Sequence, residues 1–245
     1  MQVALFVPCY IDQLYPDIAV STYNILKKFG ADVYYPEKQT CCGQPAFNTG
    51  YFEETKKLAL KFFRDFKEAE YIVAPSGSCV TMVKKLYAEL DLNENQKEDW
   101  LNIAGKIYEL TEFLVKVMNV SGIDGEFNSS VTYHDSCHLL RELGVKDEPR
   151  MLLNSIKGLD FVEMEKSEVC CGFGGTFAVK YADISTAMVE NKVHWALESG
   201  AEMLTGCDVS CLMNIDGYIQ RMAYPIKVEH IANIIWKAIE NKNMQ

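Results

Sequence analysis

Residues 41–46 read CCGQPA and residues 170–175 read CCGFGG, so two neighbouring cysteines followed by glycine occur twice in one chain. The other cysteines repeat around these triplets with nearly constant spacing, which gives each half four aligned cysteines. The pairs are Cys9 with Cys137, Cys41 with Cys170, Cys42 with Cys171, and Cys79 with Cys211. A constant register over four positions indicates that one structural unit is written twice.

Short apolar runs alternate with amphipathic stretches in both halves, which is the pattern of β/α units. In the first half we expect strands at 3–9, 32–36 and 71–75, and helices at 15–29, 52–66 and 80–90. In the second half we expect strands at 131–135, 159–164 and 202–206, and one long helix at 177–198. Each half closes with a short strand running into a helix. The pattern predicts an α/β protein of two similar Rossmann-like domains with small parallel sheets, related by internal duplication.

Two polar stretches have the composition of connectors. Residues 91–100, DLNENQKEDW, are expected to form a surface loop inside the first half. Residues 121–130, SGIDGEFNSS, contain two glycines and three serines and are the expected domain boundary. We therefore predict an N-terminal domain over 1–120, a linker over 121–130 and a C-terminal domain over 131–245.

Composition excludes several functional classes. The 245 residues carry a net charge of −10 and no block of Lys or Arg, which argues against nucleic acid as a partner. No apolar run reaches the roughly 18 residues of a transmembrane segment, so peripheral membrane association would run through a partner. The start of the chain lacks the basic region of a signal peptide, and the expected location is cytoplasmic. Thiols stay reduced there, which favours metal binding or redox chemistry over disulfides.

The cysteines of each half follow different strands of the predicted sheet. Because the carboxyl ends of parallel strands meet at one edge, loops that leave those ends converge on a shared crevice. Two groups of four thiols are expected to gather in this way. The first group is Cys9, Cys41, Cys42 and Cys79, and the second is Cys137, Cys170, Cys171 and Cys211.

Neighbouring cysteines suit a cluster of several metal atoms better than one small ion, since successive side chains of extended backbone point in opposite directions. Gly43 and Gly172 let the backbone approach closely and offer N–H groups to sulfur. A [4Fe–4S] cluster held by four thiolates is anionic, and helix N-termini at the same sheet edge would stabilise it. We therefore expect one or two [4Fe–4S] clusters.

The cysteine pattern resembles that of the CCG, or cysteine-rich, domain family, whose signature is a cysteine, a Cys-Cys-Gly triplet and a final Cys-x-x-Cys. YHDSCHLLRELG at 133–144 is also similar to a His-x-x-Cys-His stretch of that family. The resemblance implies an iron–sulfur electron-transfer subunit of an L-lactate (2-hydroxy acid) oxidising complex. It would be a non-catalytic or co-catalytic subunit of an L-lactate dehydrogenase type oxidoreductase, with companion iron–sulfur and accessory subunits as partners.

The chain departs from the signature where the first cysteine of the final Cys-x-x-Cys would stand, because Ser76 and Asp208 occupy those places. Four cysteines per half remain, which is enough for a cubane [4Fe–4S] cluster. Cys207, next to Asp208, stays open as a further ligand or as a packed thiol. His134 and His138 flank Cys137, and we expect them to support the bound centre through hydrogen bonds.

Two alternatives stay open. Four thiolates also form a closed tetrahedral zinc site, so the chain could be a structural zinc-binding or interaction module, or could hold zinc in one half and a cluster in the other. The resemblance to the cysteine-rich subunit of heterodisulfide reductase implies the second alternative, a thiol/disulfide redox subunit. Without metal, that chemistry would need a reactive cysteine with a lowered pKa and a resolving partner.

Overall fold

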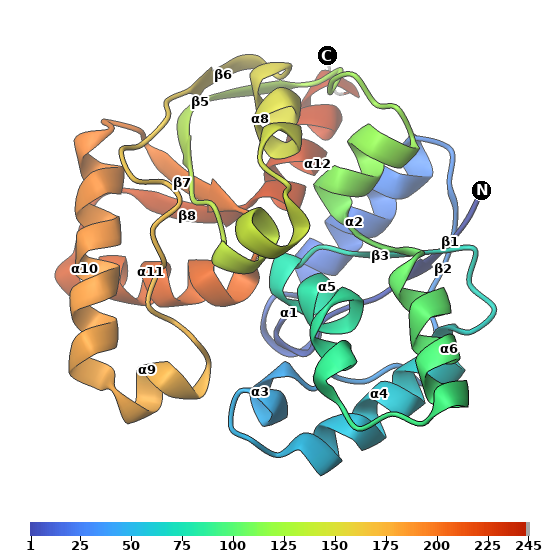
Figure 1. Cartoon of the computed structure of the whole chain (residues 1–245). Coiled ribbons are helices and arrows are strands. Elements are labelled where there is room, and N and C mark those ends of the chain that lie inside the picture. The colour runs from blue at the N-terminus through green and yellow to red at the C-terminus, as the bar shows by residue number, and fades with distance from the viewer. Residues whose placement is uncertain (244–245) are drawn as a thin grey trace. The chain divides into compact units, whose positions relative to one another are not determined.

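The computed structural model describes residues 1–243, which divide into two compact units with the boundary between Met118 and Asn119. Each unit contains one four-stranded parallel sheet with helices packed on it (Figure 1). This confirms the predicted α/β class with two small parallel sheets. Among residues 1–243, no helix combines the length and apolar character that a bilayer crossing requires. The domain limits of 1–120 and 131–245 stay a prediction.

The first sheet has the strand order β2-β1-β3-β4, so the chain crosses over β1 between its second and third strands. All three pairings are parallel. The strands are β1 (Gln2–Leu5), β2 (Asp32–Tyr34), β3 (Tyr71–Ala74) and β4 (Ile107–Glu109). Because the order reverses at β1, the loops after β1 and β3 leave neighbouring strands at the same edge.

Helices connect these strands. They are α1 (Cys9–Leu14), α2 (Pro16–Lys28), α3 (Gln44–Phe47), α4 (Phe52–Phe66), α5 (Gly77–Lys84), α6 (Glu94–Ala104) and α7 (Leu110–Glu112), with a 3₁₀ turn η1 (Leu86–Glu89) and a π-helical turn η2 (Phe113–Val117). α4 covers the predicted helix over 52–66 from its first residue to its last.

An aromatic cluster forms part of the core of the first unit. Phe6, which directly follows β1, meets Phe62 of α4 edge to face at 4.9 Å between ring centroids, and Phe62 stacks on Phe66 at 4.3 Å. Tyr87 closes the cluster against Phe63. All five rings are buried, so this cluster fixes α4 against the sheet through both burial and ring geometry.

The second sheet repeats the arrangement of the first, with the strand order β6-β5-β7-β8 and parallel pairing throughout. The strands are β5 (Glu126–Tyr133), β6 (Lys157–Phe161), β7 (Met203–Gly206) and β8 (Lys227–His230). The helices are η3 (His138–Glu142, a π-helical turn), α8 (Asp147–Asn154), α9 (Thr176–Lys180), α10 (Ala182–Glu198), α11 (Val209–Met222) and α12 (Ile231–Asn243).

The second unit buries its apolar side chains between α10, α11 and the sheet (Figure 1). Val193 of α10, Ile215 of α11 and Leu204 of β7 are fully buried in this cluster. Cys171 and Cys211 belong to the same cluster, so this apolar core extends up to two of the predicted ligands.

The predicted surface loop over 91–100 was wrong, because residues 94–104 form α6. Asn93 caps this helix: its side chain accepts a hydrogen bond from the Gln96 backbone N–H, and the Gln96 side chain accepts one from the Asn93 backbone N–H. This reciprocal pair satisfies two backbone donors that a helix start otherwise leaves without partners. A polar composition therefore concealed a well-capped surface helix.

Two further expectations differ from the structure. Residues 126–130 of the expected linker belong to β5, where Glu126, Ser129 and Ser130 pair with β6. The expected helix over 177–198 is broken at Tyr181, which has a non-helical backbone with ψ of 53° and separates α9 from α10. Neither glycine nor proline stands at this break, so the local sequence gives no signal for it.

Glu109 is a fully buried carboxyl group at the end of β4. One carboxyl oxygen accepts hydrogen bonds from the backbone N–H groups of Thr111 and Glu112, and so caps α7. Its other oxygen, Oε1, has no hydrogen-bond partner among the described residues. Burial outweighs the capping hydrogen bonds and raises the pKa of Glu109 to about 7.

We predict that Glu109→Gln changes how stability depends on pH. In the wild type the unfolded state loses the Glu109 proton near its ordinary pKa, whereas the folded state keeps it up to about pH 7. This group therefore stabilises the fold fully below about pH 4.5 and loses that contribution as pH rises to 7, on the order of 3 kcal/mol in total. Urea unfolding of both proteins from pH 4.5 to 8 measures it. A wild-type-minus-variant difference that stays constant with pH would contradict the assignment.

Candidate metal centres

The four predicted cysteines of the first unit come together in the structure. Cys9 begins α1, Cys41 and Cys42 lie in the loop after β2, and Cys79 lies in the first turn of α5. The Sγ atoms of Cys9 and Cys41 are 3.5 Å apart, and those of Cys42 and Cys79 are also 3.5 Å apart. Cys41 further hydrogen-bonds to Cys42, so contacts link all four thiols.

The second unit gathers its four cysteines in the same pattern. Cys137 hydrogen-bonds to Cys170, Cys170 to Cys171, and Cys171 to Cys211. The correspondence is position by position with the first unit, since Cys211, like Cys79, is the third residue of its helix. All nine cysteines of the chain are within the described residues, and none of them forms a disulfide.

One thiol in each group is strongly favoured to ionise. Hydrogen bonds from Cys42 and Cys9 lower the pKa of Cys41, and hydrogen bonds from Cys137 and Cys171 lower the pKa of Cys170. The neighbours shift in the opposite direction, because donating to Cys41 raises the pKa of Cys9. In each group one thiol is thus the most readily ionised, and a thiolate is the form of cysteine that binds metal.

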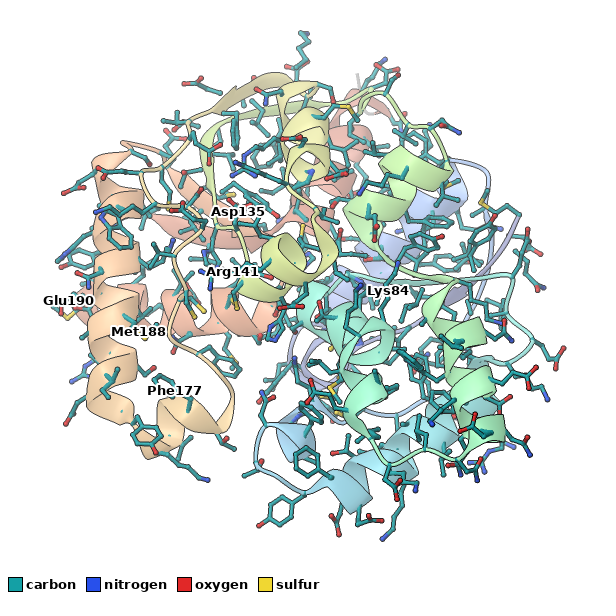
Figure 2. The ribbon with its side chains drawn as sticks, viewed as in Figure 1. Lys84, Asp135, Arg141, Phe177, Met188 and Glu190 are labelled. Carbon is teal, nitrogen blue, oxygen red and sulfur yellow. The ribbon has the colours of Figure 1, made fainter. Side chains whose placement is uncertain are left out.

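The glycine of each triplet has a left-handed backbone, with φ of 84° at Gly43 and 83° at Gly172. This turn aims the glycine N–H back at the first cysteine, so that N and Sγ are 3.4 Å apart in both units. At Gly172 an added Cβ would lie 2.8 Å from the Ser185 carbonyl oxygen and 2.8 Å from Cβ of Met188, which Figure 2 shows on α10. Glycine is required there for conformation and for space.

Side chains from neighbouring elements anchor the backbone of each triplet. The Tyr87 hydroxyl donates to the Cys42 carbonyl at 2.7 Å, and the Asn214 amide donates to the Cys171 carbonyl at 2.9 Å. In the second unit Ser185 of α10 adds a hydrogen bond to the Gly172 carbonyl. These bonds fix the backbone of each triplet, in which the glycine N–H faces the sulfur of the first cysteine.

Ser76 and Asp208 take the place of the missing family cysteines and cap the two helices that carry Cys79 and Cys211. The Ser76 hydroxyl accepts from the Cys79 backbone N–H at 3.4 Å, and a carboxylate oxygen of Asp208 accepts from the Ser210 backbone N–H at 3.3 Å. Both cysteines thus lie in the first turn of a helix, where the partial positive charge of the helix dipole favours a thiolate.

Asp135 fixes the loop that leads from β5 to Cys137. Its buried carboxylate accepts two hydrogen bonds from Arg150 at 2.9 and 2.7 Å and a third from the Ser167 hydroxyl at 2.9 Å. Figure 2 shows Asp135 in this loop. The Arg150 pairing is bidentate, which sets the orientation of the loop as well as its position.

The remaining predicted site residues lie in the second unit. His134 is 1% exposed, and burial lowers its pKa to about 4, so its ring is neutral at pH 7. His138 places Nδ1 3.8 Å from the Cys137 Sγ. Cys207 is fully buried and accepts a hydrogen bond from the Tyr133 hydroxyl at 3.2 Å.

The donor chemistry of both groups fits an iron–sulfur centre. Each offers four sulfur donors, backbone N–H groups directed at sulfur, and a helix N-terminus at the same edge, which together suit an anionic cluster. In the second unit the ligand atoms of His134, Cys171 and Cys211 also lie within 4.8 Å of one another, a separation that suits a single metal atom. From the sequence, His134 is expected to support the centre through hydrogen bonds and not to be one of its donors.

Comparison with known proteins gives the same picture of two repeats. The CCG cysteine-rich domain family matches residues 3–84 and again residues 131–216. Lactate utilization protein A of Oceanobacillus iheyensis is 46% identical over 235 residues, 96% of each chain. The protein of that name from Halalkalibacterium halodurans is 46% identical over 236 residues, again 96% of each chain.

A solved structure shares the fold. A hypothetical protein from Helicobacter pylori superposes with a TM-score of 0.69 at 10% identity over 97% of this chain. This chain spans about half of that protein, 49% of its length. At such low identity the likeness concerns the fold alone.

We predict that Gly172→Ala destabilises the protein far more than Gly30→Ala. Gly30 has φ of 89° and nothing within 4 Å of an added Cβ, so its substitution adds left-handed strain alone, about 1 kcal/mol. Gly172→Ala adds a backbone clash to that strain and should lose about 3 kcal/mol. Urea unfolding under reducing, metal-free conditions compares the two variants. Equal losses would show that the loop moves freely away from α10.

Proposed function

The chain belongs to the CCG cysteine-rich domain family, beside relatives named lactate utilization protein A, and we propose that it is an iron–sulfur electron-transfer subunit of an L-lactate oxidising system. The observation that carries this proposal is the gathering of four thiols in each unit, with contacts linking all members of each group. Lactate as the source of electrons rests on the names of the relatives.

The proposed ligands are the eight cysteines of the two groups. They are Cys9, Cys41, Cys42 and Cys79 in the first unit, and Cys137, Cys170, Cys171 and Cys211 in the second. When bound, a [4Fe–4S] cluster takes up and releases one electron at a time. The chain would supply the cysteine sulfurs as ligands of the cluster and would donate N–H hydrogen bonds from Gly43 and Gly172 to them. It would also exclude water from the buried side of each group.

Lactate oxidation to a 2-oxo acid releases two electrons and two protons, so a one-electron carrier needs partners. We propose that companion iron–sulfur and accessory subunits oxidise the substrate and pass the electrons on singly. The proposed location is the cytoplasm, where the thiols stay reduced before the centres are assembled.

Cys207 is proposed to be a packed thiol. It follows β7 at the position that Pro75 occupies after β3, and the Tyr133 hydroxyl already donates to its sulfur. It serves as a control for the ligand cysteines, since it is a buried cysteine of the second unit that lies outside the proposed ligand set.

We predict that protein purified without oxygen contains iron and acid-labile sulfide in equal amounts, about four of each per occupied unit. Cys41→Ser should remove the iron and sulfide bound by the first unit, and Cys170→Ser those bound by the second, because each substitution removes a ligand thiolate. Elemental analysis for iron, sulfide and zinc, with visible and electron paramagnetic resonance spectra, measures this. Cys207→Ala should keep the full content.

The same measurement separates the alternatives. Absence of iron and sulfide from the wild type would end the iron–sulfur proposal. Zinc that falls in only one of the two serine variants would assign zinc to that unit. Loss of iron in Cys207→Ala, with an unchanged circular dichroism spectrum, would make Cys207 a ligand.

We further predict that L-lactate reduces the centres only through the partner subunits. In an anaerobic mixture with the companion subunits, addition of L-lactate should bleach the visible absorption of the clusters, and D-lactate serves as the control. The isolated chain should show no bleaching with L-lactate, although dithionite should reduce it. Bleaching of the isolated chain by L-lactate would mean that this chain oxidises the substrate itself.

A further inference from the structure

The two units place different residues at one equivalent position beside their cysteines. Phe6 follows β1 and donates its backbone N–H to the Val73 carbonyl at 2.9 Å. His134 follows β5 and donates its backbone N–H to the Thr205 carbonyl at 2.8 Å. Each of them stands three residues before the first cysteine of its group. The position is therefore the same in both units, and only its side chain differs.

The neighbour of this position differs as well. Gly43 packs against Thr55 and Leu58 of α4, and Gly172 packs against Ser185 and Met188 of α10, which aligns the two helices. The alignment pairs Phe62 of α4 with Lys192 of α10. The first unit thus has the Phe6–Phe62 ring contact where the second has His134 and the buried Lys192.

His134 has no hydrogen-bond partner for either ring nitrogen among the described residues, although its side chain is buried. Lys192 does not serve it, because its ammonium group donates to the carbonyls of Lys166 and Ser167 at 2.7 and 3.0 Å. A buried polar group without a partner costs free energy, and a structural histidine would be hydrogen-bonded. The absence of a partner for the His134 ring among the described residues suggests that a bound group supplies one.

Two cysteine sulfurs lie close to the His134 ring. A ring nitrogen of His134 and the Sγ atoms of Cys171 and Cys211 lie within 4.8 Å of one another. Bonds of about 2.3 Å in tetrahedral geometry set two sulfurs about 3.8 Å apart on one metal atom, so little movement is needed. Among the described residues, this is the one group of three such donors that is so compact.

We propose that a ring nitrogen of His134 binds the metal centre of the second unit, which then has mixed nitrogen and thiolate ligands while the centre of the first unit has thiolates alone. Two kinds of metal atom bind imidazole and thiolate together, an iron atom of a cluster and a zinc ion. The iron case rests on the proposed function, and the zinc case does not. The two centres differ chemically in either case, because only the second would have an imidazole among its ligands.

All four histidines of the chain, at 134, 138, 194 and 230, lie in the second unit, so an imidazole signal has few origins. The test uses the full chain, purified without oxygen, as wild type, His134→Phe and His138→Phe. His134→Phe installs the residue that the first unit uses at this position. His138→Phe removes the other imidazole near Cys137 and is the matched control.

If the centre contains iron, pulsed electron paramagnetic resonance of the reduced protein should show the strong coupling of a directly bound nitrogen. If it contains zinc, X-ray absorption at the zinc edge should show the scattering pattern of a bound imidazole. Either signal should be lost in His134→Phe and kept in His138→Phe. Labelling the wild type with ¹⁵N-histidine should change the iron-based coupling to the ¹⁵N pattern, which gives a result even where a variant does not fold.

The inference is overturned when neither method detects a bound imidazole in the wild type, or when the signal survives in His134→Phe. These outcomes are distinct from failure of the proposed function. Protein without iron and sulfide refutes the electron-transfer role, while an imidazole signal at the zinc edge would still support the ligand role of His134.

Discussion

Parallel strands deliver the loops that follow them to one edge of a sheet, and both candidate centres depend on this constraint. In each unit the segments that follow the first, second and third strands carry the cysteines, so sulfur atoms distant along the chain become neighbours. The strand order matters too. With β1 and β5 inside their sheets, each central loop is flanked by the other two. The helices that follow begin at the same edge and turn their N-termini toward the sulfurs.

Much of this arrangement could be predicted from the sequence, because the signals were local or repeated. Apolar runs marked the strands, and the repeated register of four cysteines identified corresponding loops before any contact was known. Gly43 and Gly172 were singled out for close approach, and their left-handed backbones do direct an N–H at sulfur. Ser76 and Asp208 were recognised only as absent cysteines, whereas the structure gives both a role as helix caps.

The sequence failed where the deciding contact was a specific hydrogen bond or a distant packing partner. Asn93 and Gln96 form a capping box with the usual three-residue spacing, but the polar composition of 91–100 by itself favours a loop. The break at Tyr181 has no local signal. His134 was assigned a supporting role from its place beside Cys137, since its orphaned ring and its nearness to Cys171 and Cys211 depend on how β5, β7 and α11 assemble. The correspondence between Phe62 of α4 and Lys192 of α10 likewise becomes visible only when the two helices are aligned.

In each group of thiols, two cysteines are buried and two are partly exposed to solvent. Cys42, Cys79, Cys171 and Cys211 are at most 9% exposed, whereas Cys9, Cys41, Cys137 and Cys170 are in partial contact with solvent. Electron tunnelling weakens steeply with distance, so a donor or acceptor protein would have to dock over the partly exposed cysteines. Dioxygen would enter by the same route. If a cluster is bound as proposed, the side of each group that would allow electron transfer would also be the side open to oxidation, and covering it would slow both processes.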